Sequence, residues 1–140
     1  MVENFYSSLA KIGYSHPVHP MLTHIPMGMV IAMVVFSFLG LIWKEKNFAQ
    51  TAFYCAVFAL VAILPVISAG LLDWLHYQQG EWNPYIVIKM ILAGVLTVLL
   101  IFAVVLYRKG TLPGKMFFIY LLCLGCAGGL GYCGGALVYG

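Results

Sequence analysis

The apolar residues of this chain gather into four long runs, and most of the polar residues lie between them. The runs cover residues 21–43, 48–72, 84–107 and 116–139. Crossing the hydrocarbon core of a bilayer takes about 20 helical residues. None of the runs alternates apolar and polar residues with period two, as the strands of a membrane barrel would. Because backbone polar groups in lipid must be hydrogen-bonded within the protein, this pattern predicts four transmembrane helices.

The segments that connect the runs are short, covering residues 44–47, 73–83 and 108–115. Short connections make consecutive helices antiparallel, so we predict an all-α fold, an integral membrane four-helix up-down bundle. Residues 21–140 then form a single transmembrane domain, preceded by an external N-terminal segment, residues 1–20. That segment lacks the apolar central run of a cleavable signal peptide. Within it, residues 3–12 are expected to form a short interfacial helix.

The composition excludes several classes of protein. The chain is 64% hydrophobic and only 8% charged, whereas a soluble domain carries about 25% charged residues. Disorder is excluded as well, because it requires low hydrophobicity. The net charge of +3, without a clustered basic face, gives no case for nucleic-acid binding. The partner that this composition requires is a lipid bilayer.

The basic residues predict an orientation. The side with the first and third connections has one acid, Glu45. It carries five basic residues: Lys44, Lys46, Arg108, Lys109 and Lys115. Lys and Arg accumulate on the cytoplasmic side of membrane proteins. We therefore expect a multi-pass protein of the prokaryotic plasma membrane with both termini on the external, periplasmic side.

The strongest functional signal is the one-sided placement of ionisable residues. Antiparallel helices bring one group of them to the external end of the bundle: His16, His19, His24, Asp73, His76 and Lys89. The other half of the runs has no His, Asp, Glu, Lys or Arg. Ionisable groups inside a membrane are energetically expensive and usually functional.

Histidines between the helices of a bundle are typical axial ligands of haem iron. On neighbouring antiparallel helices, His24 and His76 could ligate one b-type haem from opposite faces, with His16 and His19 as alternatives. A ligating imidazole usually donates its second N–H to an acceptor, and Asp73 is the candidate.

Three further interpretations concern the same end of the bundle. Lys89 could pair with a haem propionate or with Asp73, or extend towards the membrane surface. A copper, iron or zinc ion is an alternative to haem, because His and the nearby Met21, Met27 and Met29 are metal ligands. A proton or quinol site is a third reading, since imidazole titrates near neutral pH.

Three sequence motifs resemble those of a known family. HPVHPMLTHIPMG opens the first run, SAGLLDWLHY ends the second, and GGALVYG closes the chain. They are similar to an uncharacterised family of prokaryotic four-helix membrane proteins, a domain of unknown function, whose opening motif reads roughly HPxHPxLxHFP. The resemblance implies a role for His16, His19, His24, Asp73 and Trp74. It also implies an association with Rieske-type or cytochrome c domains on the external side.

Together these observations predict a non-catalytic electron-transfer subunit of the membrane. It would hold b-type haem near the external face and pass electrons from a membrane donor, for which quinol is the candidate, to an external cytochrome or Rieske-type protein in a larger redox complex. The alternatives are a membrane metal-binding protein and a cofactor-free structural subunit.

Overall fold

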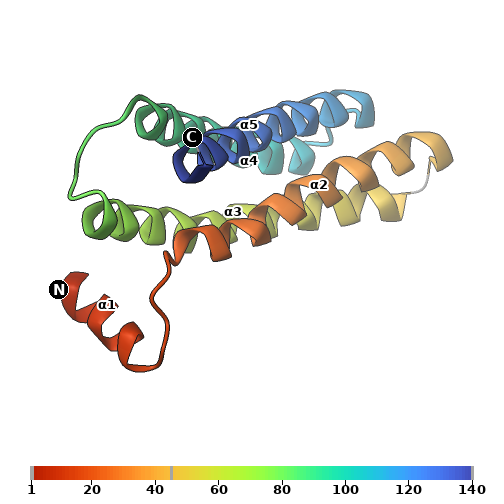
Figure 1. Ribbon diagram of the computed structural model, residues 1–140. Helices are drawn as coiled ribbons and strands as arrows, with labels where there is room; N and C mark the ends of the chain where they lie inside the picture. Colours follow the sequence, from red (N-terminus) through yellow and green to blue (C-terminus); the bar gives the residue numbers. More distant parts are fainter. Residues whose placement is uncertain (1, 45, 140) are drawn as a thin grey trace.

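The computed structural model describes residues 2–44 and 46–139, and these form an all-helical fold (Figure 1). A short helix, α1 (Val2–Lys11), precedes four long ones: α2 (His19–Trp43), α3 (Lys46–Tyr77), α4 (Pro84–Arg108) and α5 (Pro113–Tyr139). All four long helices are long and apolar enough to cross a membrane. The predicted four-helix membrane fold is therefore confirmed, and a helix is present in the N-terminal segment. Glu45, the acid counted in the orientation argument, lies outside the described residues.

The four long helices form two antiparallel pairs that pack against each other. Figure 1 shows α2 beside α3 and α4 beside α5. The pairs meet where α2 packs against α5 and where α3 packs against α4. In this arrangement α2 and α4 lie on one diagonal of the bundle. A contact between those two helices must therefore cross the bundle interior.

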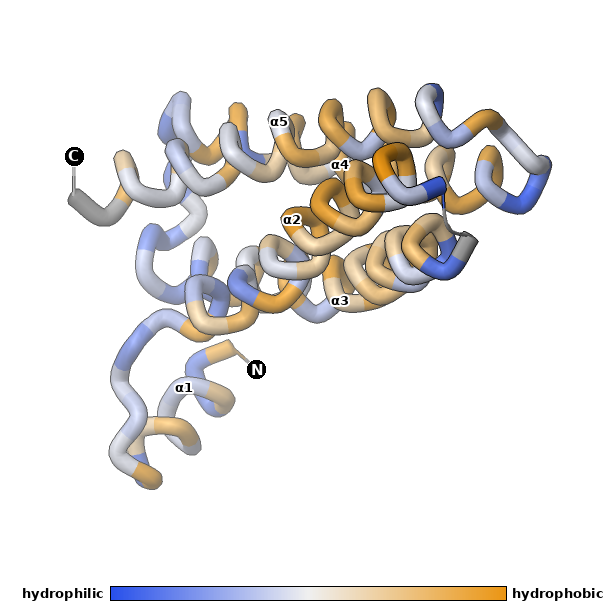
Figure 2. The backbone as a smooth tube through the Cα atoms, turned by 90° about the vertical axis from the view of Figure 1, so that its right-hand side faces the viewer, coloured by the Kyte–Doolittle hydropathy of each residue, from blue (hydrophilic) through white to orange (hydrophobic). Residues whose placement is uncertain are grey.

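The core is narrow and built largely from small residues. Ala52, Ala56 and Ala59 of α3 are fully buried, and they pack with larger side chains such as Met33 and Leu100. Small residues allow membrane helices to approach closely. Figure 2 shows that hydrophobic residues occupy most of the middle of the long helices.

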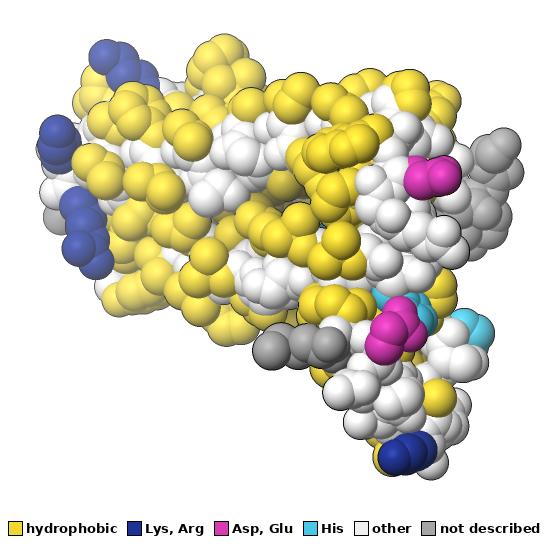
Figure 3. Space-filling view, turned by 90° about the vertical axis from the view of Figure 1, so that its left-hand side faces the viewer, with side chains coloured by type: hydrophobic (Ala, Val, Ile, Leu, Met, Phe, Trp, Pro, Cys, Tyr) yellow, Lys and Arg dark blue, Asp and Glu magenta, His cyan; other side chains and the backbone are white. Residues whose placement is uncertain are grey.

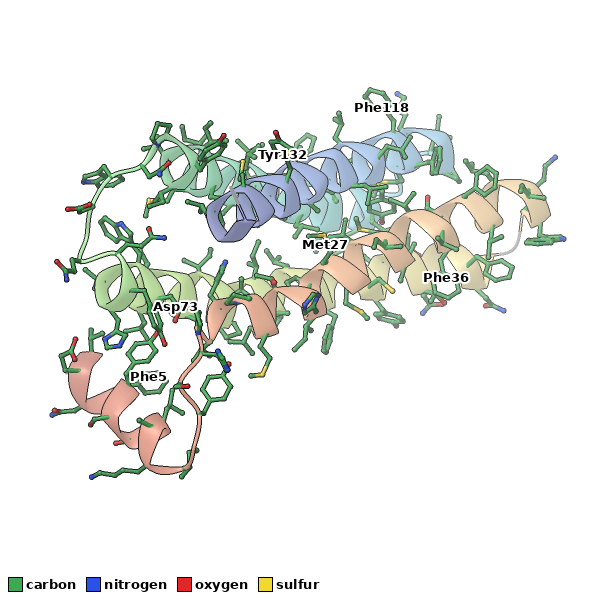
Figure 4. The ribbon with its side chains drawn as sticks, viewed as in Figure 1. Phe5, Met27, Phe36, Asp73, Phe118 and Tyr132 are labelled. Carbon is green, nitrogen blue, oxygen red and sulfur yellow. The ribbon has the colours of Figure 1, made fainter. Side chains whose placement is uncertain are left out.

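Many large apolar side chains point away from the bundle. Phe118 and Tyr132 of α5, labelled in Figure 4, are 63% and 74% exposed. In water such a surface would drive association, but in a bilayer it is the surface that lipid covers. The outward apolar faces are thus a second sign, besides helix length, that the bundle is membrane-embedded.

Helix α3 continues beyond the second apolar run. The run ends at residue 72, and α3 ends at Tyr77. The apolar run ends earlier because the last turns of α3 carry Asp73 and His76, which find partners in α1 and α2. Gln79 and Gly80, both with positive φ, then turn the chain. The side chain of Asn83 starts α4 by accepting a hydrogen bond from the backbone N–H of Tyr85 at 2.9 Å.

The two ends of the bundle carry different charges. In Figure 3 most of the Lys and Arg side chains lie at one end, and the acidic and His side chains lie at the other. We call these the basic end and the histidine end. The basic end includes Lys44, Arg108, Lys109 and Lys115, and the histidine end includes α1, the start of α2 and the end of α3.

Candidate functional site

Asp73, on the last turns of α3, is the hub of the histidine end (Figure 4). Its carboxylate accepts hydrogen bonds from the backbone N–H groups of Val18 at 3.2 Å and His19 at 2.8 Å. The residue before α2 is Val18, which offers no side-chain cap of its own. A carboxylate from a neighbouring helix therefore caps α2, satisfies N–H groups that its first turn leaves free, and complements the helix dipole.

Tyr6 connects α1 to this hub. Its side chain is only 6% exposed, and its hydroxyl donates a hydrogen bond to Oδ1 of Asp73. Burial, together with this hydrogen bond, raises the pKa of Tyr6 above its ordinary value of 10.0. The Tyr6 ring also stacks on the imidazole of His76, with ring centroids 4.0 Å apart. One buried tyrosine thus fixes the short helix against the end of α3.

Two more contacts hold the N-terminal segment in place, one to α1 and one to the chain between α1 and α2. Nδ1 of His76 lies 3.0 Å from Oε1 of Glu3, which forms an ion pair when the imidazole is protonated. The hydroxyl of Tyr77 donates a hydrogen bond to the carbonyl of Ser15 at 3.3 Å. The helix α1 is therefore docked by side chains of the same two turns of α3 that cap α2.

His19 is held in one orientation between α2 and α3. Its Nδ1 lies 2.9 Å from the carbonyl oxygen of Val66. A carbonyl oxygen can only accept a hydrogen bond, so Nδ1 carries the proton and, in the neutral imidazole, Nε2 keeps its lone pair. The close approach depends on Gly70, because a Cβ added there would lie 2.9 Å from Nδ1 of His19.

Lys89 of α4 faces the free nitrogen of that imidazole. Its Nζ lies 3.4 Å from Nε2 of His19, with both side chains part-buried. On its other side the ammonium group is close to Gly134 of α5, where an added Cβ would lie 3.9 Å from Nζ. We call the pair His19 and Lys89, with the Val66 carbonyl, the histidine–lysine centre. All four spanning helices surround it, and it crosses the diagonal from α2 to α4.

The structure brings together some of the predicted site residues and separates others. Asp73, His19 and Lys89 lie within one polar cluster, and His76 is attached to it through Tyr6. His24 is exposed on α2, and His16 is exposed with its ring edge-on to Tyr14.

Asp73 and Lys89 have partners in the structure other than some of those considered for them from the sequence. Asp73 was expected to accept a hydrogen bond from an imidazole, but backbone N–H groups and Tyr6 occupy it, and the Val66 carbonyl takes that role for His19. Lys89 lies nearest to His19 rather than to Asp73. Among the described residues, no three His, Cys, Asp or Glu side chains gather in a metal-binding arrangement.

Tyr6, Glu3 and Gly70 were not predicted as parts of this site. Gly70 precedes Asp73 by three residues, so both lie on one face of α3, and this spacing could have marked the face that receives the start of α2. No comparable signal pointed to Tyr6 or Glu3, since a contact between residues separated by more than 60 positions leaves no trace in local pattern.

Comparison with known proteins finds a family but no characterised relative. Residues 15–140 match a family described as "Predicted membrane protein (DUF2231)". No curated protein and no solved structure matches the chain. The matched region contains α2 to α5 and the whole histidine–lysine centre, whereas α1, with Tyr6 and Glu3, precedes it.

Proposed function

For this chain, which belongs to the DUF2231 family of predicted membrane proteins, we propose the function of a non-catalytic membrane subunit of an electron-transfer complex. Its histidine end would hold a redox group, with haem b as the leading candidate. Electrons would pass between a membrane donor, for which quinol is the candidate, and an external cytochrome or Rieske-type protein.

The observation that carries this proposal is the hydrogen bond from Nδ1 of His19 to the Val66 carbonyl. Metal-ligating histidines usually donate one ring N–H to a carbonyl or carboxylate, which fixes the tautomer and leaves the other nitrogen as the ligand. His76 has a similar arrangement with the Glu3 carboxylate. Its ring, however, is stacked on Tyr6 beside α1, away from the bundle interior where Lys89 faces His19. His19 is therefore the residue that we favour as iron ligand, in place of the predicted pair His24 and His76.

The imidazole of His19 is a donor that haem iron accepts, and iron binding at its Nε2 would require Lys89, whose Nζ lies 3.4 Å from that atom, to turn aside. A bound haem would supply one-electron chemistry. The residues of this chain prepare the ligand: the Val66 carbonyl fixes the imidazole tautomer, Gly70 leaves room for the ring, and Asp73 anchors the backbone of His19. Lys89 places a cation beside the centre, where it would offset the negative charge of a haem propionate.

The test is a reduced-minus-oxidised absorption spectrum of detergent-purified protein, with a pyridine haemochrome assay on the same sample. We expect near-stoichiometric b-type haem in the wild type, loss of most of the Soret band in His19→Ala, and full haem content in the matched control His24→Ala. Full haem in His19→Ala would contradict its role as ligand. Loss in His24→Ala and His76→Ala alone would restore the pair predicted from sequence.

A featureless spectrum from haem-replete cells would overturn the haem proposal. Elemental analysis of that sample would then separate the two alternatives. Stoichiometric copper, iron or zinc would indicate a metal-binding protein, and the absence of all three would indicate a structural subunit.

We also propose that the histidine end faces outward from a prokaryotic plasma membrane. The basic end carries Lys44, Arg108, Lys109 and Lys115, and such residues accumulate on the cytoplasmic side. A membrane-impermeant maleimide applied to intact cells should label Ser8→Cys in α1 but not Thr111→Cys between α4 and α5. The reverse labelling would contradict this orientation.

A further inference from the structure

A cavity of ≈ 680 Å³, about half open to the outside, lies at the basic end of the bundle, away from the histidine–lysine centre. The end of α2 and the start of α5 form most of its wall, and Ala49 of α3 and Tyr107 of α4 complete it. Ligand pockets in proteins measure about 300–1,000 Å³, so the space suits a molecule rather than a single ion. The lining is mainly apolar and includes Leu41, Leu112 and Met116.

The described charged residues that line this cavity have one sign. Lys44, directly after α2, and Lys115, in the first turn of α5, both line it. Among the described residues that line it, none is acidic. The start of α5 also belongs to the wall, and the first turn of a helix offers free N–H groups and the positive end of its dipole. An anionic group at the mouth of the cavity would therefore be attracted from several directions.

A buried hydroxyl lies deeper in the same wall. Tyr120 lines the cavity and is only 2% exposed, and its hydroxyl has no hydrogen-bond partner among the described residues. Buried polar atoms without a partner are rare in proteins. Tyr120 follows Lys115 by five residues, which places it about 7.5 Å deeper along the axis of α5. The cavity thus has a cationic mouth, and the enclosed hydroxyl of Tyr120, one of its lining residues, lies behind the wall without a partner among the described residues.

We propose that this cavity binds the head group and glycerol backbone of an anionic phospholipid. The phosphate would lie between Lys44 and Lys115, and an ester carbonyl would accept a hydrogen bond from Tyr120. The exposed Trp43 beside Lys44 marks the head-group level of the membrane. Basic pockets between membrane helices on the cytoplasmic side are known to bind anionic lipid head groups.

Other ligands match fewer of these features. A quinone or sterol brings no negative charge for the two lysines, and a fatty acid brings no second acceptor for Tyr120. Free phosphate would satisfy the lysines but leave the apolar walls without a partner. An anionic glycerophospholipid has the charge, the deeper acceptor and the apolar chains, which would continue over the outer surface of the bundle.

The proposal is tested by native mass spectrometry of the full chain, purified and exchanged into mixtures of phosphatidylglycerol and phosphatidylcholine. We expect one phosphatidylglycerol retained in preference to phosphatidylcholine. Lys44→Gln and Lys115→Gln should each weaken this retention about fivefold, since one lysine near an anionic lipid contributes about that factor. The matched control Lys109→Gln removes the same charge at the same end but outside the cavity, and should change retention less than about twofold.

Tyr120→Phe provides an independent readout. In phosphatidylcholine alone the variant should be at least as stable as wild type, because it removes an unsatisfied hydroxyl. In phosphatidylglycerol the lipid should raise the free energy of unfolding less for the variant than for wild type.

Equal retention of both lipids, or an equal loss of retention in Lys109→Gln and Lys115→Gln, would overturn the proposal. Full competition by inorganic phosphate would also overturn it, in favour of a site for the free anion. The haem variant His19→Ala should leave lipid retention unchanged, so this test is separate from that of the proposed function.

Discussion

The two ends of the bundle differ in how most of their polar groups are paired, although Oε1 of Gln78, directly after α3, is also buried without a partner among the described residues. At the histidine end Asp73, His19 and His76 each have a partner from another helix, and Tyr6 links two of them. At the basic end the lysines that line the cavity are exposed, and the hydroxyl of Tyr120 is buried without a partner in the part of the chain that the structure describes. Hydrogen-bond partners within the protein hold the side chains of a site in one orientation before a ligand binds, which suits a site that must orient its ligand. Groups without internal partners are left for lipid, water or another ligand to satisfy.

The largest expected effect comes from breaking the hub of the histidine end. Asp73→Ala removes the acceptor of three hydrogen bonds and leaves the first turn of α2 uncapped. Because hydrogen bonds to a carboxylate contribute about 1.5–3 kcal/mol each and are not additive, we expect a loss of roughly 3 kcal/mol in the free energy of unfolding. Reversible unfolding in detergent measures it. The control is Glu81→Ala, an exposed acid near the same end, which should cost less than about 0.5 kcal/mol. Equal losses would show that the hub is no more important than a surface charge.

A smaller loss in the free energy of unfolding is expected for Gly70→Ala, at the point where His19 approaches α3. Gly70→Ala would place Cβ 2.9 Å from Nδ1 of His19, and overpacking of this kind costs about 1–3 kcal/mol. Haem content, if haem is bound, should fall together with stability. Gly28→Ala on α2 is the matched control, because nothing lies within 4 Å of its added Cβ and Ala is the better helix former. If both variants are equally stable, the close approach of His19 to α3 does not contribute to stability.

The attachment of α1 should show a pH dependence. Tyr6→Phe loses the hydrogen bond to Asp73, so we expect wild type to be more stable by about 1 kcal/mol at neutral pH. The pKa of Tyr6 is raised in the folded protein above its ordinary value of 10.0. This contribution is therefore fully present below pH 10.0 and declines as the pH rises above it.

Two measurements follow the attachment of α1. Unfolding free energies across that pH range and hydrogen exchange in residues 2–11 report global and local stability. Tyr132→Phe, which is exposed and far from α1 in Figure 4, should change neither. A difference between wild type and Tyr6→Phe that does not narrow in alkali would contradict the hydrogen bond.

The smallest expected effect is at the basic end. The guanidinium of Arg108 lies 6.0 Å from the centre of the Phe53 ring, a contact that contributes about 0.5–1 kcal/mol at an exposed site. Arg108→Gln should therefore lower stability by no more than that, in the same unfolding assay. If Arg108→Gln lowered the free energy of unfolding as much as Asp73→Ala, the two ends would not differ in how much their polar contacts stabilise the fold.

The candidate site could be predicted in part. The sequence placed His19, Asp73, His76 and Lys89 at one end of the bundle, because antiparallel helices of known length leave little choice about which ends meet. The prediction from sequence favoured His24 over His19 because His24 lies further along the helix, and therefore deeper in the membrane, when residues are counted from the helix start. The side of the helix that faces the interior could not be counted in the same way, and the structure places His19 inward and His24 outward.

Hydropathy alone determined that this chain forms four long apolar helices, because only helices of that length satisfy the backbone in a bilayer without side-chain help. Tertiary structure decided which face of each helix packs inward. In a membrane both the lipid-facing and the core-facing sides are apolar, so periodicity that would orient a helix in water carries little information. The contacts between Tyr6 and Asp73 and between His19 and Lys89 join residues 67 and 70 positions apart. They exist only once the helices have packed.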